Sequence, residues 1–288
     1  MTVNLLTIKD IRSYLDKELK DLYDHNETAF LSKIITKTIF AGAGLHEIYN
    51  PGNSLSAVQK SGIINYVDEL KKGKPYQYVL GETEFYNCII KVSPAVLIPR
   101  PETEELVDII IKENRNFKGD IIDFGSGSGC IAIALKRHIP GADLTSFDIS
   151  DDALRVAELN ASINNVNVRF EKNDILNFQN QSKSKAGIIV SNPPYVRNSE
   201  KSGMKKNVLD FEPGAALFVD DNDPLIFYRA ILEISENILQ PGGKVYFEIN
   251  EALGTEMKDL LKQYDYSCIT IIKDLNDRDR FAKAIRNE

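Results

Sequence analysis

From residue 101 onward, short apolar segments typical of β-strands alternate with stretches that have the periodicity of helices. The candidate strands span residues 120–124, 143–148, 168–171, 187–191, 244–250, 268–273 and 281–285. Strands that alternate with helices predict a mostly parallel sheet covered by helices on both faces. We therefore expect an α/β fold for this part of the chain.

The first part of the chain follows a different pattern. Apolar residues within 5–22 recur at spacings of three and four, which is typical of one face of a helix. Two further helices are predicted to begin at the caps Asn26 and Ser54, and a short helical turn follows over residues 76–80. We expect a small helical bundle domain in residues 1–84, and its sequence carries no chemical motif.

Between these two regions, residues 85–92 and 96–98 have strand composition on either side of a turn at Ser93-Pro94. This pattern predicts a hairpin linker over residues 85–98. The hairpin would join the helical domain to a second domain spanning residues 99–288.

Composition excludes several classes of protein. The formal net charge of -7 disfavours tight, non-specific binding to nucleic acid, which depends on Lys and Arg neutralising phosphates. The cysteines and histidines are scattered without ligand spacing, so we expect no structural metal. The N-terminus lacks the pattern of a secretory signal, and no apolar run is long enough to span a bilayer. We expect a cytoplasmic monomer with no membrane attachment.

A glycine-rich segment, residues 123–129 (DFGSGSG), follows an apolar strand and precedes a helix. Glycines at such a junction let the backbone turn sharply and approach a ligand closely. The spacing is G-x-G-x-G, whereas a dinucleotide fingerprint needs a third glycine at position 130, which Cys130 occupies. This disfavours a dehydrogenase. A tight strand-to-helix turn without a ligand is the alternative interpretation.

Two aspartates follow the next two strands. Asp148 stands roughly 20 residues after the glycine segment, where an acidic residue can accept both hydroxyls of a ribose. Asp174 ends the following strand, and its carboxylate could accept from an adenine amino group. Each could instead be a helix cap or a turn residue. Because the carboxyl ends of these strands meet at one edge of the sheet, the set favours a cofactor that contains adenosine.

The segment Asn192-Pro193-Pro194-Tyr195 follows the fourth strand of the alternating region. Two prolines stiffen this segment and leave their carbonyls without competing N–H groups of their own. The Asn192 side-chain carbonyl and the Pro193 backbone carbonyl could accept the two hydrogens of one –NH₂ group. The Tyr195 ring could stack on a planar amide or base. A proline turn that closes a loop is the alternative.

Together these motifs resemble the HemK/PrmC family, the peptide-chain release factor N5-glutamine methyltransferases, over nearly the whole chain. The marks of the resemblance are the segments 81–86 (GETEFY), 97–104 (LIPRPETE), 123–129, 192–195 (NPPY), 212–213 (EP) with 216–217 (AL), and 241–243 (PGG). The segment 192–195 also occurs in other methyltransferases of amino groups, and 99–103 is far more specific. Asn87 departs from the family pattern, which has glycine there, and this affects a turn.

The resemblance implies a class I (Rossmann-like) methyltransferase with a seven-stranded sheet whose last strand is antiparallel. It implies S-adenosyl-L-methionine as cofactor and the glutamine of the Gly-Gly-Gln loop in class I release factors as substrate. The cofactor would contact Arg100, Pro101, Thr103, Asp123, Gly125, Ser126, Gly127, Gly129, Asp148, Asp174 and Asn192. The substrate would contact Asn192, Pro193, Pro194, Tyr195 and Glu212, and the catalytic residues would be Asn192, Pro193 and Tyr195.

Other functions remain open from the sequence. A nucleic-acid adenine methyltransferase would need nearly the same pocket, with a flipped base in place of the amide. The acidic charge and the lack of a basic recognition domain speak against it. A non-catalytic adaptor with this fold is a third interpretation, which the intact Asn192 disfavours. We expect the helical domain to recognise the substrate protein.

Overall fold

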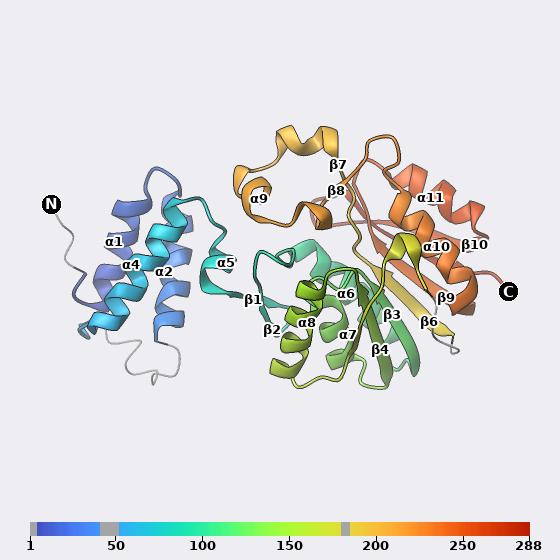
Figure 1. Ribbon diagram of the computed structural model, residues 1–288, viewed down its shortest axis with the longest axis horizontal. Coiled ribbons are helices and arrows are strands. Elements are labelled where there is room, and N and C mark those ends of the chain that lie inside the picture. Colours follow the sequence, from blue (N-terminus) through green and yellow to red (C-terminus); the bar gives the residue numbers. More distant parts are fainter. Residues whose placement is uncertain (1–4, 41–51, 180–184) are drawn as a thin grey trace. The chain divides into compact units, whose positions relative to one another are not determined.

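The structure, a computed structural model, describes residues 5–40, 52–179 and 185–288. The chain forms two compact units (Figure 1). The first takes in the chain up to Gly81 together with Lys205–Phe211, and the second comprises Glu82–Met204 and Glu212–Glu288. Each unit has its own architecture.

The first unit is a helical bundle. Among its described residues the helices are α1 (Ile8–Leu19), α2 (His25–Ile39), α4 (Ala57–Lys71), α5 (Tyr76–Leu80) and the separate α9 (Lys206–Phe211). The buried core comes from one face of each of the longer helices, as the helical periodicity predicts, and includes Ile11, Leu15, Leu31, Ile63 and Val67.

Two predicted helix caps were wrong by two residues each. Asp24, rather than Asn26, caps α2, because its carboxylate accepts from the backbone N–H groups of Asn26 and Glu27. Ser56 caps α4 and accepts from Gln59 N, whereas Ser54 forms a β-bridge with Thr7. In both helices the side chain three residues after the cap, Glu27 or Gln59, accepts from the backbone N–H of the cap residue. This reciprocal pair of hydrogen bonds is a capping box. A further prediction, that α2 stops at Gly42 and Gly44, lies outside the described residues.

The predicted hairpin turn at Ser93-Pro94 was also wrong in position. The hairpin consists of β1 (Glu82–Phe85) and β2 (Cys88–Lys91), which pair in antiparallel fashion around Tyr86 and Asn87. Both turn residues have positive φ, 43° and 61°, as a two-residue hairpin turn of type I′ requires. Asparagine tolerates this conformation, so Asn87 can stand where the family has glycine. The hairpin belongs to the second unit.

The core of the second unit is a seven-stranded sheet with the order β10-β11-β9-β6-β3-β4-β5. The strands are β3 (Gly119–Phe124), β4 (Ala142–Asp148), β5 (Arg169–Lys172), β6 (Ala186–Ser191), β9 (Leu239–Glu248), β10 (Tyr266–Lys273) and β11 (Asp279–Arg286). β11 pairs antiparallel with both neighbours, and the other described pairs are parallel. This confirms the predicted fold class, including the antiparallel last strand.

Helices cover the sheet. They are α6 (Pro101–Asn114), α7 (Cys130–His138), α8 (Asp151–Ile163), α10 (Ile226–Ile238) and α11 (Gly254–Gln263). Helix α7 packs against both α6 and α8, while α11 packs on β10 and β11. The central strand β6 is buried along its full length, since it lies inside the sheet with helices on each side. A small parallel pair, β7 (Val196–Arg197) and β8 (Phe218–Val219), lies outside the main sheet.

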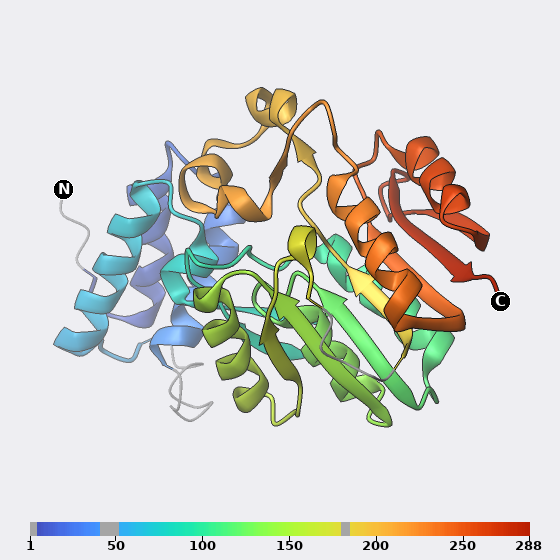
Figure 2. The ribbon, with the colours of Figure 1, turned by 45° about the vertical axis from the view of Figure 1, so that its right-hand side comes forward.

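The strand order places a candidate site at the carboxyl ends of the central strands. The chain passes from β3 to β4 and β5 on one side, and then returns to β6 and β9 on the other side of β3 (Figure 2). The connections that leave β3 and β6 therefore run in opposite directions, and a crevice forms between them at the carboxyl ends of these two strands. Within the described part of the chain, no helix is both long and apolar enough to cross a bilayer.

Candidate functional site

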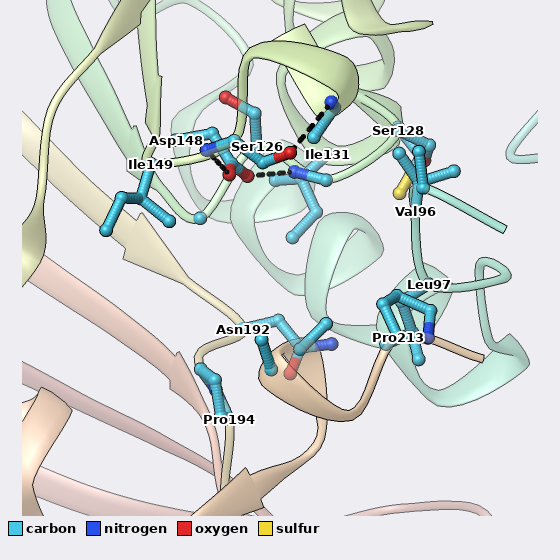
Figure 3. A pocket seen from close by; sticks show the side chains of 18 of the residues that line it. Val96, Leu97, Ser126, Ser128, Ile131, Asp148, Ile149, Asn192, Pro194 and Pro213 are labelled. Atoms are coloured by element: carbon cyan, nitrogen blue, oxygen red, sulfur yellow. Dashed lines mark hydrogen bonds between the residues drawn. The ribbon is translucent and has the colours of Figure 1, made fainter. Parts of the chain in front are cut away.

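A cavity of about 430 Å³ opens at the carboxyl ends of β3, β4, β5 and β6 (Figure 3). Its walls are the loops that follow these strands, together with two segments from outside the sheet. The sequence-assigned residues that line it are Arg100, Thr103, Gly125, Ser126, Gly127, Asp148, Asp174, Asn192 and Pro194. Those that lie outside its lining are Pro101, Asp123, Gly129, Pro193, Tyr195 and Glu212. Figure 3 shows Asn192 and Pro194 on the side opposite Ser126 and Asp148.

The glycine loop forms one wall from bare backbone. The N–H groups of Gly125 and Ser126 both donate to Phe147 O, at 2.8 and 2.9 Å, which holds the loop against β4. Gly127 has a φ of +50°, and a Cβ added there would meet no atom within 4 Å. Its backbone therefore faces open space. At Gly129 a Cβ would lie 3.0 Å from the Ala157 Cβ, so that glycine permits close packing of α7 on α8.

Asp148 combines a structural role with a free acceptor capacity. Its Oδ2 accepts from Gly127 N at 2.8 Å, and its Oδ1 accepts from Ser150 N at 2.9 Å. A carboxylate offers about four lone-pair sites, so Asp148 retains acceptors for two hydroxyls. The next residue, Ile149, also lines the cavity and is 60 % exposed, which leaves an aliphatic face beside the carboxylate.

Asp174 caps the short 3-10 helix η1 (Ile175–Asn177). It accepts from Leu176 N at 2.9 Å and from Asn177 Nδ2 at 2.8 Å. The capping role that the sequence left open is thus present, and Asp174 lines the cavity as well. Leu176 beside it is 44 % exposed, so a second aliphatic side chain faces the cavity next to an acceptor.

Asp123 lies behind the glycine loop, fully buried at the end of β3. Its Oδ2 accepts from Ser146 Oγ at 2.6 Å, and Ser146 Oγ is 2.7 Å from Ser126 Oγ. Asp123 Oδ1 has no hydrogen-bond partner among the described residues. Burial raises the pKa of Asp123 to about 7, and the negative Asp148 adds to the rise, while the Ser146 bond opposes it.

These features fit an adenosine-containing cofactor. Two carboxylates provide acceptors for hydroxyl and amino groups, and an exposed aliphatic side chain stands beside each one. The bare backbone at Gly127 leaves room for a ligand to approach, and the orphaned Asp123 oxygen is an unused acceptor behind the loop.

At the other end of the cavity, Asn192 is held in a defined orientation. The Ser191 hydroxyl donates to Phe124 O at 2.6 Å and fixes the start of the segment to β3. Asn192 Nδ2 donates to Thr103 Oγ1 at 3.1 Å, and Thr103 Oγ1 donates to Glu248 Oε2 at 2.7 Å. No hydrogen bond to Asn192 Oδ1 forms among the described residues, so this oxygen is available to a ligand.

Tyr195 is directed away from the cavity lining. Its hydroxyl donates to Glu248 Oε1 at 2.9 Å, and its backbone carbonyl accepts from Asn250 Nδ2 at 3.1 Å. Burial holds the pKa of Tyr195 well above its usual range, with the Glu248 carboxylate as a further cause. Pro193 is buried and also lies outside the lining. The stacking role of Tyr195 and the acceptor role of the Pro193 carbonyl stay predictions.

Arg100 and Glu212, which the sequence assigned separately to cofactor and substrate, bind each other. Arg100 Nη2 donates to Glu212 Oε1 at 2.6 Å, and Ile98 N donates to Glu212 Oε2 at 3.1 Å. The Glu212 side chain is 1 % exposed. Both of its oxygens are thus used to join the wall segment 95–100 to the wall that begins at Pro213.

Sequence reasoning missed Glu248 as a site residue. It is a buried carboxylate at the carboxyl end of β9, and it binds the side chains of both Thr103 and Tyr195. A signal was available, because a charged residue at the carboxyl end of an apolar strand is unusual in the core of a parallel sheet. No group of three or more His, Cys, Asp or Glu side chains that could hold a metal ion occurs in the described ranges.

Solved structures share this fold. A methyltransferase from Pyrococcus furiosus aligns with a TM-score of 0.53 at 18% identity, covering 81% of this chain and 100% of that one. The Thermus thermophilus 16S rRNA N2 G1207 methyltransferase, solved with AdoMet and guanosine, also aligns with a TM-score of 0.53, at 17% identity over 72% of this chain and 50% of that one. Residues 102–211 match the family model described as methyltransferase small domain. The fold and the site therefore define a class I methyltransferase, which uses S-adenosylmethionine.

Curated relatives place the chain more closely. A release factor glutamine methyltransferase of Bacteroides thetaiotaomicron is 41% identical over 276 residues, which cover 96% of this chain and 99% of that protein. One of Flavobacterium psychrophilum is 42% identical over 284 residues, with the same coverage of both chains. The chain belongs to the family of release factor glutamine methyltransferases.

Proposed function

We propose that this protein transfers a methyl group from S-adenosyl-L-methionine to the side-chain amide nitrogen, N5, of the glutamine in the Gly-Gly-Gln loop of class I peptide-chain release factors. The observation that carries the proposal is the Asn192 side chain. Its nitrogen is bound to Thr103 and its oxygen is left as an acceptor in the cavity lining. The relatives at about 40% identity support the substrate. The reaction takes place in the cytoplasm, where release factors act.

The adenosine end of the cavity holds the cofactor. Asp148 accepts the ribose hydroxyls, Asp174 accepts from the adenine amino group, and Ile149 and Leu176 pack against the base. The glycine loop approaches the cofactor through its backbone at Gly127. When bound, the cofactor would supply an electrophilic methyl group on a sulfonium sulfur, and the electron pair of the broken sulfur–methyl bond would remain on sulfur in the product S-adenosyl-L-homocysteine.

The reacting end must activate a poor nucleophile, because the lone pair of an amide nitrogen is delocalised into its carbonyl. Asn192 Oδ1 and the Pro193 carbonyl accept the two N–H hydrogens of the substrate amide. They hold its nitrogen in place and stabilise the positive charge that develops on it, as the donors of an oxyanion hole stabilise negative charge. The proton that the methylated nitrogen must lose passes to water, so no strong base is required.

Positioning supplies much of the remaining rate enhancement. Well-oriented reactants can lower a barrier by roughly 7–11 kcal/mol. The Arg100–Glu212 pair contributes here, because it fixes two walls of the cavity to each other through a carboxylate with 1 % exposure. A rigid wall keeps the amide aligned and limits the entry of water.

The walls of the cavity suit the side chain of a glutamine. Pro194, Pro213, Ala215 and Ala216 are small or apolar and suit the methylene stem of a glutamine. A base would be read by hydrogen bonds along its Watson–Crick edge and by stacking between flat side chains. Phe227 lines the cavity and its ring can pack on an amide or on a base, so the lining alone does not separate the two substrates. The net charge of -7 gives no attraction to a polyanion.

Mass spectrometry of a release factor tests the proposal. After incubation with the protein and S-adenosylmethionine, the peptide that contains Gly-Gly-Gln should gain the mass of one methylene on its glutamine. The Asn192→Ala variant provides the matched control and should leave the peptide unmodified in the same time. Transfer of labelled methyl groups to DNA or RNA, with none to the release factor, would contradict the proposal.

A further inference from the structure

Glu248 is the buried acid at the end of β9, and the mechanism above gives it no role. It is 1 % exposed and lies outside the cavity lining. Three hydroxyl groups converge on it. Thr103 Oγ1 and Tyr195 Oη donate to its two carboxylate oxygens, and Tyr228 Oη donates to its backbone carbonyl at 2.8 Å. Burying a carboxylate is costly, so an acid kept here needs a reason beyond packing.

Burial and hydrogen bonds act in opposite directions on the pKa of this acid. Burial raises the pKa of Glu248, and the negative Glu102 adds to the rise. The two hydroxyl donors and the positive charge of Arg280 oppose it. Arg280 is itself paired with Asp274, with 3.3 Å between Arg280 Nε and Asp274 Oδ2. On balance the pKa of Glu248 is raised, and it is the geometry that indicates a carboxylate: each of its two oxygens accepts from a different hydroxyl, and a carboxylate can only accept hydrogen bonds.

The hydroxyl of Thr103 connects the Glu248 carboxylate to the Asn192 side chain. A threonine hydroxyl has a single proton, and here it is directed at Glu248 Oε2. Toward Asn192, Thr103 therefore presents only a lone pair. The Asn192 atom that lies 3.1 Å away must be the donor Nδ2, because two acceptors would repel each other. Asn192 Oδ1 is consequently turned away from Thr103.

We propose that Glu248 and Thr103 are positioning residues that set the direction of the Asn192 amide, so that its oxygen faces the substrate. The proposal rests on the proposed function for what the substrate is, but the direction of the amide can be measured without any substrate. An Asn192 in the reversed orientation would present two N–H donors to the substrate –NH₂ group and would repel it. Asparagine alone has no preference between its two orientations, whereas the chain of bonds from Glu248 supplies one.

The test uses the full-length protein and four single variants of it. Thr103→Val keeps the shape of the side chain but removes the hydroxyl, and Thr103→Ser restores it. Glu248→Gln keeps the shape but adds a donor, which permits the chain of bonds to reverse. Tyr228→Phe is the matched control, because it removes a buried hydroxyl from the backbone of the same glutamate and leaves Thr103 and Asn192 untouched.

Two measurements are made on each variant. The first measurement compares two quantities in each variant: kcat for release factor methylation and Kd for the cofactor. We expect kcat to fall about 10- to 100-fold in Thr103→Val and in Glu248→Gln, somewhat less than for the loss of a pre-aimed catalytic group. The cofactor Kd should change less than about threefold, a cost below that of a typical lost hydrogen bond. Thr103→Ser should recover most of the rate, and Tyr228→Phe should lower the melting temperature but keep kcat.

The second measurement is hydrogen exchange of the Asn192 side-chain amide by NMR, with the signal assigned by its loss in Asn192→Ala. One Nδ2 hydrogen should be protected in the wild type and in Thr103→Ser, and it should exchange rapidly in Thr103→Val. Equal rates in the Val and Ser variants, a loss confined to cofactor Kd, or unchanged protection in Thr103→Val would overturn the proposal. If the wild type methylates no release factor, the proposed function fails while the exchange data still decide the orientation.

Discussion

Asp123 shows how burial alone changes the behaviour of one side chain. The sequence places it at the end of a strand as a cofactor contact, and the structure buries it fully with one oxygen unpaired. Its pKa rises from 3.8 to about 7, mainly because burial disfavours the charged form. The folded chain therefore binds this proton more tightly than the unfolded chain does. The stability from this group is complete below about pH 4, declines as the pH rises, and is lost above about pH 7.

The variant Asp123→Asn tests this. It keeps the shape and an acceptor for Ser146, but it cannot ionise. Between pH 5 and pH 8, the free energy of unfolding of the wild type should fall relative to that of Asp123→Asn by about 2–3 kcal/mol. Urea unfolding without added cofactor at several pH values measures the difference. Parallel pH profiles for the two proteins would show that Asp123 is ionised throughout this range.

Asn192 carries the second prediction at this scale. Asn192→Ala should leave the fold and the cofactor affinity largely intact, because the adenosine end of the cavity lies on the opposite wall. Turnover should fall by roughly 10²–10³, as when one pre-aimed group of an oxyanion hole is removed. Single-turnover methylation and calorimetry of cofactor binding separate the two effects. A large loss of cofactor affinity would instead make Asn192 chiefly a cofactor residue.

Among the elements, the hairpin is attached to helix α8 by two side-chain amides one turn apart. Asn160 Oδ1 accepts from Lys91 N at 2.7 Å, and Asn160 Nδ2 donates to Lys91 O at 2.9 Å. Asn164 Oδ1 likewise accepts from Ile89 N at 3.2 Å, and Asn164 Nδ2 donates to Ile89 O at 2.8 Å. The amides thus pair with β2 as a neighbouring strand would. Asn160 Nδ2 also donates to Ser128 O at 2.9 Å, which connects the hairpin to the glycine loop.

We expect Asn160→Ala to lower the free energy of unfolding by about 2–4 kcal/mol, because it leaves buried backbone groups without partners. The cofactor affinity should also fall, since Ser128 loses its anchor. Asn164→Ala is the matched control: its bonds are more exposed, and about 0.5–1.5 kcal/mol should be lost, with cofactor affinity preserved. Urea denaturation and calorimetry on both variants measure these changes. Equal destabilisation by the two variants would show that the link to Ser128 adds nothing.

The elements also show which features a sequence can predict. The central strands β3 and β6 were found because each is an apolar run of about the right length, a property that is local to the segment, whereas the polar edge strand β5 was found from its place in the alternation of strands and helices. Only the family resemblance indicated a turn at Asn87, because the segment lacks the glycine that usually marks such a turn, and Pro94 gave a stronger local signal for the hairpin. The bond between Thr103 and Glu248 joins residues 145 positions apart, so only the folded sheet reveals it. Carboxylates at strand ends were predictable, whereas the partners of each side chain were not.

At the scale of the whole molecule, each of the two units has a hydrophobic core of its own. In the first, the core consists of helix faces and includes Ile11, Leu15 and Val67. In the second, one large cluster joins the sheet to α10 and α11 and includes Tyr228 and Phe247. The cavity and every residue that lines it belong to the second unit. The first unit is therefore free to serve another purpose, and we propose that it binds the body of the release factor.

A chain that starts at Glu82 tests this proposal, because it lacks the first unit apart from α9 and retains the complete core and cavity of the second unit. It should bind cofactor within a few-fold of the full-length protein. A glutamine on the loop of a large protein must be held while a poor nucleophile reacts, and contacts remote from the reacting atoms can supply that binding energy. Methylation of an intact release factor should therefore fall much more than methylation of a short Gly-Gly-Gln peptide, and the kcat/KM of both proteins on both substrates measures this. Equal losses on peptide and protein would assign the helical unit to stabilising the active site, whereas a selective loss on the protein would assign it to recognition.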